Sequence, residues 1–488
     1  MSDPLGLFPL AIAAGGGRVD DFEAQQLVAA GLTLLQRSAP LVRALHRRRS
    51  AIVLPTSPAY FTALAASDGR GAVLVNPLAA APEVEYQLSD ANVGAAFTIS
   101  ELADKLPASV PRVLLDDIPR SARVVVDGIG RDVDLGSHHG LTLEGDPEEP
   151  GAPDEAAIVY TSALAGIPLG ATLTHRNLIS NGRATVVAGA MDAGSHALAV
   201  LPFAHLFGLV VSGAAPLLAG GRVSTMARFN PARALDLLES DSITDFVAVP
   251  AVFAAIVALL ARRGSRLDRH RLRLCICGGA PLAAELQDRW FDLTGVELRQ
   301  GYGLTEAGPV CIFNRVDLPN RRGTLGVPFP GIRVAIRQLE SDARVPNGAT
   351  GEICVAGPNV FAGYVSSSGA PAASEDRWRA GLVRDGEWLR TGDLGAENSD
   401  GTIAFRGVVK PMFTRNGFNI YPRELERVIG AMPGVEGVSI EARPDPMREH
   451  EIAVRVVGPV TAADVQAWCT ARLAVYKRPS HITVADRP

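Results

Sequence analysis

The stretch YTSALAGIPLGATLTHRN, residues 160–177, decides the class of fold because a glycine-rich loop here joins a buried strand to a helical pattern. The apolar run at 156–160 predicts the strand. The loop has the outline of a nucleotide-phosphate site, where glycine lets backbone N–H groups approach phosphates and where hydroxyls and a lysine supply further donors. Here residues 163–165 are Ala, Leu and Ala, and Leu169 carries no charge. The sequence therefore keeps the outline of a phosphate loop and lacks its polar side chains.

The same alternation of apolar runs and helical patterns continues along most of the chain and predicts a mainly α/β architecture. Asn230 before Pro231 predicts the start of a helix, and Thr461 with Asp464 predicts a capping box at another. After about residue 323 short strands and turns take over, and the Asp-Gly pair at 400–401 predicts a hairpin turn. Strands are predicted at residues 51–54, 72–75, 156–160, 197–201, 246–249, 272–277 and 451–457.

Length and composition limit the possible classes of protein. A chain of 488 residues is too long for one core, so at least two domains are expected. The net charge is −5 and no Lys/Arg-rich tract stands out, which predicts no nucleic-acid partner. No Cys or His cluster has zinc spacing, and Cys275 and Cys277 alternate on a predicted buried strand. Without a basic N-terminal region or a bilayer-length apolar stretch, a cytoplasmic protein with no membrane span is expected.

Six motifs occur in a characteristic order: YTS…G.P.G…THRN, LPFAHLFGL, GGAPL, GYGLTE, TGDLG and NGFNIYPRELE. Together they resemble the adenylate-forming superfamily of acyl-CoA synthetases, peptide-synthetase adenylation domains and luciferases, over nearly the whole chain. The resemblance implies an α/β fold with a large N-terminal domain, residues 1–409, which includes a β-barrel-like subdomain, and a small mobile α+β domain, residues 410–488. Members make an acyl-adenylate from a carboxylic acid and ATP. They then rotate the small domain and pass the acyl group to a thiol, usually that of coenzyme A.

The resemblance also implies a site for the AMP portion of the adenylate. Tyr302 would stack on adenine, Thr305 would contact the α-phosphate, and Glu306 would hold Mg²⁺ when ATP is present. Asp393 would accept the ribose hydroxyls, with a plain turn role after Gly392 as the alternative. The remaining residues implied in cofactor binding are Gly278, Gly279, Ala280, Pro281, Gly301, Gly303 and Lys410.

A second group of motif residues suits thioester formation. The resemblance places His205 at the wall of the acyl pocket and Gly417 beside the passage for the pantetheine arm, where a glycine leaves room for a narrow chain. Phe418 is either part of that passage or an ordinary core residue. The many small residues predict a roomy pocket for a bulky apolar carboxylic acid. The predicted pocket residues are Phe203, Ala204, Val249, Ala251 and Gly278.

The departures from the family pattern concentrate on ATP chemistry. The family loop reads S-G-T-T-G-x-P-K-G, and residues 162–170 read SALAGIPLG. Val408 replaces an arginine that touches ribose, and Pro411 replaces the aspartate of a hinge pair, fixing φ near −65°. The family's terminal lysine, which bridges carboxylate and α-phosphate, would follow Pro488. A single preorganised donor to developing charge is worth about 10²–10³ in rate, so these losses predict weak or absent adenylation.

These observations favour a non-adenylating acyl-CoA ligase that transfers a preformed acyl group from AMP to coenzyme A and does not require Mg²⁺. Such a division of labour resembles that of ligases in diterpenoid antibiotic biosynthesis, which work beside a separate adenylating ligase. Two alternatives stay open. A complete ATP-dependent ligase would need Arg176 or Lys410 to replace the lost cations, and a non-catalytic protein would bind adenylates without forming a thioester.

Overall fold

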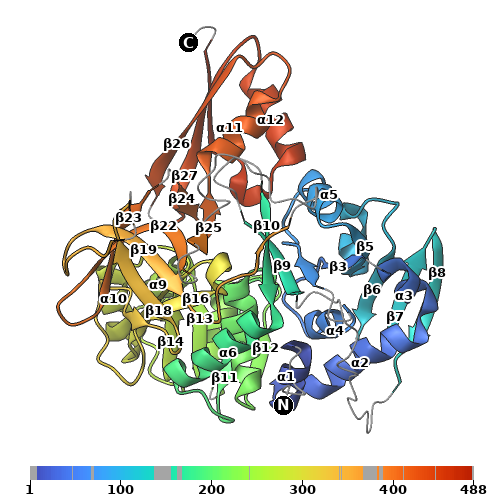
Figure 1. Ribbon diagram of the computed structural model, residues 1–488, viewed down its shortest axis with the longest axis horizontal. Helices are drawn as coiled ribbons and strands as arrows, with labels where there is room; N and C mark the ends of the chain where they lie inside the picture. The colour runs from blue at the N-terminus through green and yellow to red at the C-terminus, as the bar shows by residue number, and fades with distance from the viewer. Residues whose placement is uncertain are drawn as a thin grey trace.

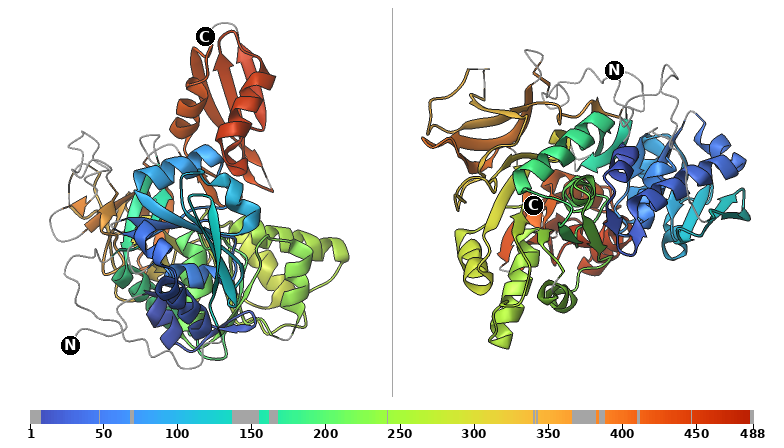
Figure 2. Two further views of the ribbon diagram at one scale, coloured as in Figure 1. Left: turned by 90° about the vertical axis from the view of Figure 1, so that its right-hand side faces the viewer. Right: turned by 90° about the horizontal axis from the view of Figure 1, so that it is seen from below.

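The computed structural model has a broad body of two lobes and a small domain that stands above the junction between them (Figure 1). Seen from the side, the small domain stands above the body as a separate unit, and seen from below it lies behind the middle of the body (Figure 2). The structure describes residues 8–46, 48–67, 71–136, 155–161, 168–240, 242–339, 341, 343–365, 382–383, 388–409, 412–445 and 447–485, with the backbone alone for residues 382, 383 and 419.

One lobe is built on a mainly parallel sheet. Its central strands are short apolar runs that are buried on both faces, as expected where helices cover both sides of a sheet. Strand β16 pairs antiparallel with β15 at one end. In order across the sheet, the strands are β17 (Val327–Pro328), β16 (Val310–Phe313), β15 (Leu298–Gly303), β14 (Leu274–Cys277), β13 (Asp245–Ala248), β11 (His196–Ala199), β12 (Arg222–Thr225), β1 (Arg18–Val19) and β2 (Phe22–Glu23).

The second lobe has a mixed sheet that contains the strand predicted before the phosphate loop. Strands β9 and β10 pair antiparallel, with Thr161 opposite Leu169. Most of the loop itself, residues 162–167, lies outside the described residues. The strand order is β20 (Gly363–Tyr364), β10 (Leu169–Thr174), β9 (Glu155–Thr161), β4 (Ala72–Leu74), β3 (Arg49–Ile52), β5 (Val93–Thr98), β6 (Arg112–Asp117), β7 (Ser121–Val126) and β8 (Ile129–Asp134).

The helices of the body begin where the sequence supplies caps. Thr174 and Asn177 of the THRN motif form a capping box at α6, with each side chain accepting from the other's backbone N–H at 3.1 and 2.8 Å. Asn230 caps α8 as predicted. The helices are α1 (Phe8–Ala14), α2 (Ala24–Arg37), α3 (Ala39–Leu45), α4 (Ala59–Ala65), α5 (Ala81–Asp90), η1 (Ser100–Lys105), α6 (His175–Gly189), η2 (Phe207–Ala214), α7 (Ala215–Leu218), α8 (Pro231–Glu239), α9 (Pro250–Arg263), α10 (Ala284–Thr294) and η3 (Thr305–Ala307).

A third, antiparallel sheet forms the expected β-rich subdomain. The Asp-Gly pair at 400–401 lies in the turn between β22 and β23, as predicted, and Gly401 has a φ of +80°. Across this turn Asp393 pairs with Val408. The strands are β18 (Arg333–Arg337), β19 (Gly351–Ala356), β22 (Trp388–Glu397), β21 (Leu382–Val383) and β23 (Ile403–Val408).

The small domain has a hairpin, a three-stranded sheet and its own apolar core, which includes Leu425, Ile452 and Val465. The capping box predicted at Thr461 is present. The predicted boundary after residue 409 falls between β23 and β24 and stays a prediction. The elements are β24 (Phe413–Arg415), β25 (Phe418–Ile420), α11 (Pro422–Gly430), β26 (Gly437–Asp445), β27 (Glu449–Val457), α12 (Ala462–Arg472), η4 (Val475–Lys477) and β28 (His481–Ala485).

The predicted fold class is therefore confirmed: a large α/β domain with a β-rich subdomain, followed by a small α+β domain. Each predicted strand corresponds to a strand of the structure within about three residues at either end. Other strands were not predicted from the sequence, among them β5, β6, β7, β8, β10, β12, β15 and β26. The residues of β26 alternate between half-buried and exposed and form no apolar run. Among the described helices, none is both long and apolar enough to cross a membrane.

Candidate active site

A large cavity of about 2460 Å³ lies between the body and the small domain, and both contribute to its wall. It brings together most of the residues singled out from the sequence. The predicted site residues that line it are Ala204, His205, Val249, Ala251, Gly278, Gly279, Ala280, Pro281, Gly301, Tyr302, Gly303, Thr305, Glu306, Asp393 and Gly417.

Two predicted residues do not join this set. The Phe203 ring is fully buried, and it packs edge-on against the rings of Tyr60 and Phe61 at centroid distances of 5.5 Å each. The structure thus corrects the predicted pocket, because Phe203 belongs to the core beneath the wall while its neighbour Ala204 lines the cavity. Lys410 lies outside the described residues.

The floor of the cavity is the carboxyl edge of the parallel sheet. Strands β13, β14 and β15 are parallel neighbours, so the segments that follow them meet at one edge, the usual ligand site of such sheets. A Cβ on Gly278 would lie 3.0 Å from the Gly301 carbonyl oxygen and 3.1 Å from the Phe207 ring. Glycine at this position lets the C-terminal ends of β14 and β15 approach each other closely. It also leaves the backbone, and no side chain, facing a ligand.

Tyr302 and Asp393 are joined by a contact that the motifs did not reveal. The Tyr302 hydroxyl donates to Asp393 Oδ2 at 2.6 Å, which links β15 to β22. Burial, with the negative charges of Glu306 and Glu352 nearby, raises the pKa of Asp393 to about 6, and the Tyr302 hydrogen bond partly opposes this rise. Asp393 is therefore a half-buried carboxylate within β22, directly after the positive-φ Gly392, and it is mostly ionised at neutral pH.

Glu306 sits deeper in the same region and already has partners. Its Oε1 accepts hydrogen bonds from the Tyr364 hydroxyl at 2.8 Å and the Thr161 hydroxyl at 3.3 Å. Burial raises the pKa of Glu306, while these two hydroxyls favour its charged form. Among the described residues no group of three or more His, Cys, Asp or Glu side chains is placed to hold a metal ion.

His205 lies at the junction with the small domain. Its Nε2 is 3.2 Å from Asn76 Nδ2, and its ring is tilted against the Phe418 ring at a centroid distance of 5.4 Å. Burial and the positive charge of Lys477 lower the pKa of His205 to about 4. The imidazole is therefore neutral at physiological pH and forms an uncharged part of the wall. The helix that follows begins with the π-helical turn η2, a local irregularity common at functional sites.

The small domain reaches the cavity through the turn of its β24–β25 hairpin. Asn416 and Gly417 both have positive φ, of 52° and 76°, as a tight hairpin turn requires. A Cβ on Gly417 would lie 2.7 Å from a Val249 methyl carbon, and the Gly417 carbonyl oxygen is 4.0 Å from the position of a Cβ on Gly279. The hairpin turn thus lies directly against the loops at the end of the parallel sheet, where only glycine fits.

A buried ion-pair cluster holds this arrangement together, and no motif pointed to it. Lys477 Nζ donates to Glu83 Oε1 of the body at 2.9 Å and to Glu424 Oε1 of α11 at 2.6 Å. Next to it, the Tyr476 ring stacks on the Phe418 ring at 4.1 Å. Glu83 and Lys477 are 394 residues apart in the sequence, so only the folded chain reveals their pairing.

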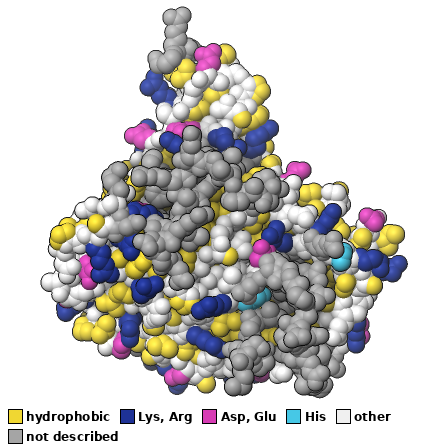
Figure 3. All heavy atoms as spheres, in the orientation of Figure 1, with side chains coloured by type: hydrophobic (Ala, Val, Ile, Leu, Met, Phe, Trp, Pro, Cys, Tyr) yellow, Lys and Arg dark blue, Asp and Glu magenta, His cyan; other side chains and the backbone are white. Residues whose placement is uncertain are grey.

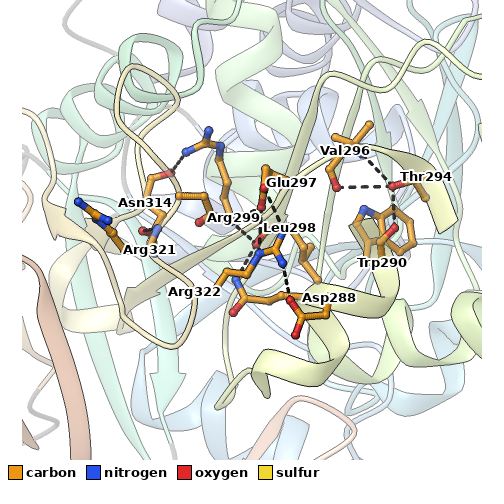
Figure 4. A network of polar contacts seen from close by, with 12 residues as sticks. Asp288, Trp290, Thr294, Val296, Glu297, Leu298, Arg299, Asn314, Arg321 and Arg322 are labelled. Carbon is orange, nitrogen blue, oxygen red and sulfur yellow. Dashed lines mark hydrogen bonds and ion pairs between the residues drawn. The ribbon is translucent and has the colours of Figure 1, made fainter. Parts of the chain in front are cut away.

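A polar network fixes the loop that supplies Leu325 to the cavity wall (Figure 4). Arg299 donates to the backbone carbonyl of Asn314 at 3.2 Å, and Arg322 pairs with Glu297 at 3.0 Å. These contacts tie the loop between β16 and β17 to β15 and to the residue that precedes it. On the molecular face drawn in Figure 3, the Lys and Arg side chains are scattered among hydrophobic ones.

Comparison with known proteins agrees with this geometry. The family model of AMP-binding enzymes matches residues 41–365. A feruloyl-CoA synthase from an Amycolatopsis species is 33% identical over 449 residues, covering 90% of this chain and 85% of its own. A long-chain-fatty-acid–CoA ligase from Escherichia coli is 28% identical over 471 residues, covering 90% and 82%.

Solved structures extend the similarity across both domains. A malonyl-CoA ligase with methylmalonyl-CoA and AMP bound is 26% identical, with a TM-score of 0.77 over 98% of this chain and 97% of that chain. An o-succinylbenzoate CoA synthetase from Bacillus subtilis, 22% identical, has the same fold, with a TM-score of 0.79 over 99% and 95%.

Proposed function

The chain belongs to the AMP-binding enzyme family as an acyl-CoA ligase, and we propose that it catalyses chiefly the second half-reaction of such ligases. In this half-reaction the acyl group of a preformed acyl-adenylate passes to coenzyme A, and AMP leaves. The observation that carries the proposal is the position of the Gly417 turn against Val249 and Gly279, because it completes the cavity with a small-domain element. The groups that act on ATP in the family are replaced by Leu169 and Val408 at the described positions.

The residues around the cavity floor fit the AMP portion of an adenylate. Asp393 Oδ2 is already bonded to Tyr302, so we assign Oδ1 to the ribose hydroxyls, and the Tyr302 ring to one face of adenine. An aromatic contact of this kind adds about 0.5–1.5 kcal/mol beyond area burial. Thr305 and the Gly278–Pro281 backbone would hold the phosphate and the carbonyl. With the acyl group already activated, the site has to orient it, admit a thiol and exclude water.

The replacement of the ribose arginine weighs against ATP as the substrate. Val408 pairs directly with Asp393, and the charges that perturb this carboxylate, Glu306 and Glu352, are both negative. Arg176, which could have replaced a lost cation, is exposed on α6 and does not line the cavity. A complete ATP-dependent ligase, the activity suggested by the names of the relatives, is the second candidate.

Magnesium fits this site poorly. Glu306 could supply one carboxylate ligand, but its Oε1 is occupied by two hydroxyl donors and burial favours its neutral form. When bound in such ligases, Mg²⁺ neutralises the polyphosphate of ATP. The proposed half-reaction has no polyphosphate, and the residues described above suffice for its binding steps.

For the acyl group we propose a bulky apolar acid delivered as its adenylate by a separate adenylating ligase, in natural-product biosynthesis of the terpenoid kind. Support comes from the small side chains of Ala204 and Ala251 and from the apolar wall that Val249 contributes. The relatives named for ferulate and for long-chain fatty acids also act on acids with large apolar parts.

A paired assay tests the function. Purified protein receives either acid, ATP, Mg²⁺ and CoA, or a synthetic acyl-adenylate and CoA, using feruloyl, long-chain and polycyclic terpenoid acids in turn. Thioester and AMP are quantified, and acid-dependent ATP–pyrophosphate exchange is measured separately. We expect thioester from at least one adenylate and little or no exchange with any acid. Exchange as fast as thioester formation would identify a complete ligase, and adenylate binding without thioester would identify a non-catalytic protein.

A further inference from the structure

The segment between β4 and α5 supplies the cavity with an asparagine that belongs to none of the six motifs. Asn76 is only 9% exposed, and it lines the cavity. Lys105 donates to the backbone carbonyl oxygens of Pro77 and Ala79, so side chains of the body hold this segment in place. Helix α5, which follows the segment, contacts α12 of the small domain (Figure 1). Asn76 is therefore a fixed polar side chain close to the junction of the two domains.

The orientation of the Asn76 amide group is determined by its two contacts. Its Oδ1 accepts a hydrogen bond from the backbone N–H of Leu78 at 2.9 Å. A backbone N–H only donates, so the amide atom that faces it must be the oxygen. The amide nitrogen, Nδ2, therefore faces the His205 ring, where it lies 3.2 Å from Nε2.

This contact decides which nitrogen of the neutral His205 ring carries the proton. An amide NH₂ group has two donors and no acceptor, so Nε2 has to accept with its lone pair. A neutral imidazole has one N–H group, which is then at Nδ1. The doubly protonated ring is disfavoured, because it would place an N–H against the Asn76 donor and a positive charge near that of Lys477.

The Nδ1 atom of His205 opens into the cavity. His205 lines the cavity, and its Nδ1 has no hydrogen-bond partner among the described residues and is not enclosed by protein atoms. The ring contacts the Phe418 ring of the small domain at a centroid distance of 5.4 Å. Gly417, next to Phe418, lies against Val249 and faces Gly279 at the cavity floor. The donor is thus located where the small-domain turn meets the cavity floor.

We propose that Asn76 is a positioning residue that holds His205 in its Nδ1–H form, so that the ring presents a hydrogen-bond donor to the acyl-adenylate. The acyl–phosphate junction of an adenylate carries a carbonyl oxygen, a bridging oxygen and phosphate oxygens, all of which are acceptors. An N–H group attracts this part of the substrate, whereas a lone pair at the same position would repel it. The assignment rests on the proposed function, and it makes His205 a donor rather than the base for the thiol.

The surroundings increase the value of this donor. The neighbouring side chains of Phe207, Val249 and Phe418 also line the cavity, but they are apolar and offer the substrate no hydrogen bond. In such surroundings a hydrogen bond to a charged oxygen is stronger than in water. Negative charge develops on the carbonyl oxygen when the thiol attacks, so a donor that is already oriented stabilises the transition state more than the bound adenylate.

Asn76→Asp tests the tautomer directly. The carboxylate keeps an acceptor for the Leu78 N–H and offers His205 Nε2 an acceptor in place of a donor, so the ring proton should move from Nδ1 to Nε2. NMR spectra of protein labelled with 15N-histidine, recorded at pH 8.5, distinguish protonated from unprotonated ring nitrogens. The His205 signals are those that disappear in His205→Asn. Asn92→Asp, the same change at an exposed position after α5, is the matched control and should keep the wild-type Nδ1–H signal.

Kinetics show whether this proton is used. We expect Asn76→Asp to lower kcat/KM for a synthetic acyl-adenylate at saturating CoA by about 100-fold, since loss of one donor to developing charge costs about 10²–10³ in rate. Asn92→Asp should stay within twofold of wild type. His205→Asn retains an amide on the atom that bears Nδ1 in histidine, Cγ. In that background Asn76→Asp should cost less than a further threefold, because no tautomer remains to be set.

Several results would overturn the proposal. An Nε2–H ring in wild type would do so without any variant, and so would an unchanged His205 tautomer in Asn76→Asp. A changed tautomer with a loss in kcat/KM below threefold would remove the donor from adenylate use. An equal loss from Asn76→Asp in wild type and in His205→Asn would reduce Asn76 to a structural support for its segment. A wild type that forms no thioester from any adenylate would refute the proposed function, and the NMR spectra would still decide the tautomer.

Discussion

Replacement of Asp393 by Asn should raise the stability of the folded protein and lower its activity with an acyl-adenylate, so the two effects can be measured separately. The substitution keeps the shape of the side chain and an oxygen that can accept from the Tyr302 hydroxyl, and it removes the ionisation. In the folded protein the pKa of Asp393 is about 6, raised mainly by burial, against an ordinary value of 3.8. Because the unfolded chain releases this proton at lower pH, the group's contribution to folding stability falls as pH rises from about 4 to about 6.

The size of the effect follows from these two values. At 1.36 kcal/mol per pH unit, the buried carboxylate destabilises the folded protein by about 1 kcal/mol at pH 4.5 and by about 3 kcal/mol at pH 7. Asn avoids this cost, so Asp393→Asn should be more stable than wild type, and increasingly so toward neutral pH. Function should change in the opposite direction. Loss of a charge-assisted hydrogen bond, worth about 1.5–3 kcal/mol, lowers kcat/KM for the adenylate by roughly tenfold to a hundredfold.

The assay has two parts. Thermal unfolding of wild type and Asp393→Asn is followed at pH 4.5, 6 and 7, and the excess in melting temperature should grow to a few degrees at pH 7. Thioester formation from synthetic adenylate is measured at saturating CoA, and wild-type kcat/KM for the adenylate should fall below about pH 6 as Asp393 becomes protonated. A variant with a melting temperature equal to that of wild type at pH 7 would show that burial does not raise the pKa of Asp393 in the folded protein. Unchanged adenylate kinetics would remove Asp393 from the ribose site.

Three further predictions test the surrounding contacts. Tyr302→Phe removes the hydroxyl that favours the ionised form of Asp393, so the pH midpoint of adenylate use should rise, and an unchanged midpoint would refute this coupling. Gly417→Ala places a methyl group against Val249 at a strained φ and should slow thioester formation more than tenfold. Val249→Ala in the same chain should recover part of the rate, and equal loss in the single and double variants would exclude the clash. Lys477→Met removes the lysine that pairs with buried Glu424 and half-buried Glu83, and should raise KM for CoA and lower the melting temperature by several degrees, while adenylate binding measured by calorimetry stays within threefold of wild type.

Local signals in the sequence were sufficient for much of the fold. The strands of the parallel sheet are short apolar runs because both of their faces are buried, and such runs are visible in a single sequence. The capping box at Thr461 involves residues only three positions apart, so their residue types alone predicted it. Strand β26 was missed because its exposed face carries charged residues and its partner lies beyond a turn. Its place in the sheet depends on pairing with β27 rather than on its own pattern.

The candidate site was predictable where family motifs carry it, and unpredictable where contacts link distant segments. The Tyr302–Asp393 hydrogen bond spans 91 residues, and the Lys477–Glu83 ion pair spans 394. Neither has a spacing that a sequence pattern could reveal. Phe203 was misplaced for a related reason: in a segment with no regular period, adjacent residues face opposite ways, and only packing decides that Ala204 faces the cavity.

The electrostatics of the cavity floor bear on which nucleotide it suits. Asp393 and Glu306 are both half-buried in the cavity wall, each has a raised pKa, and Glu306 contributes to the shift of Asp393. A negatively charged ligand is repelled by these carboxylates, and the repulsion grows with the charge of the ligand. The low local dielectric constant strengthens each of these repulsions. ATP would bring a triphosphate, whereas an acyl-adenylate brings one phosphate esterified on both sides. Leu169, in place of a loop cation, and Val408, which pairs with Asp393, supply no positive charge to offset the larger negative one. In the proposed function, these two carboxyl groups would therefore disfavour a bound triphosphate more than a preformed adenylate.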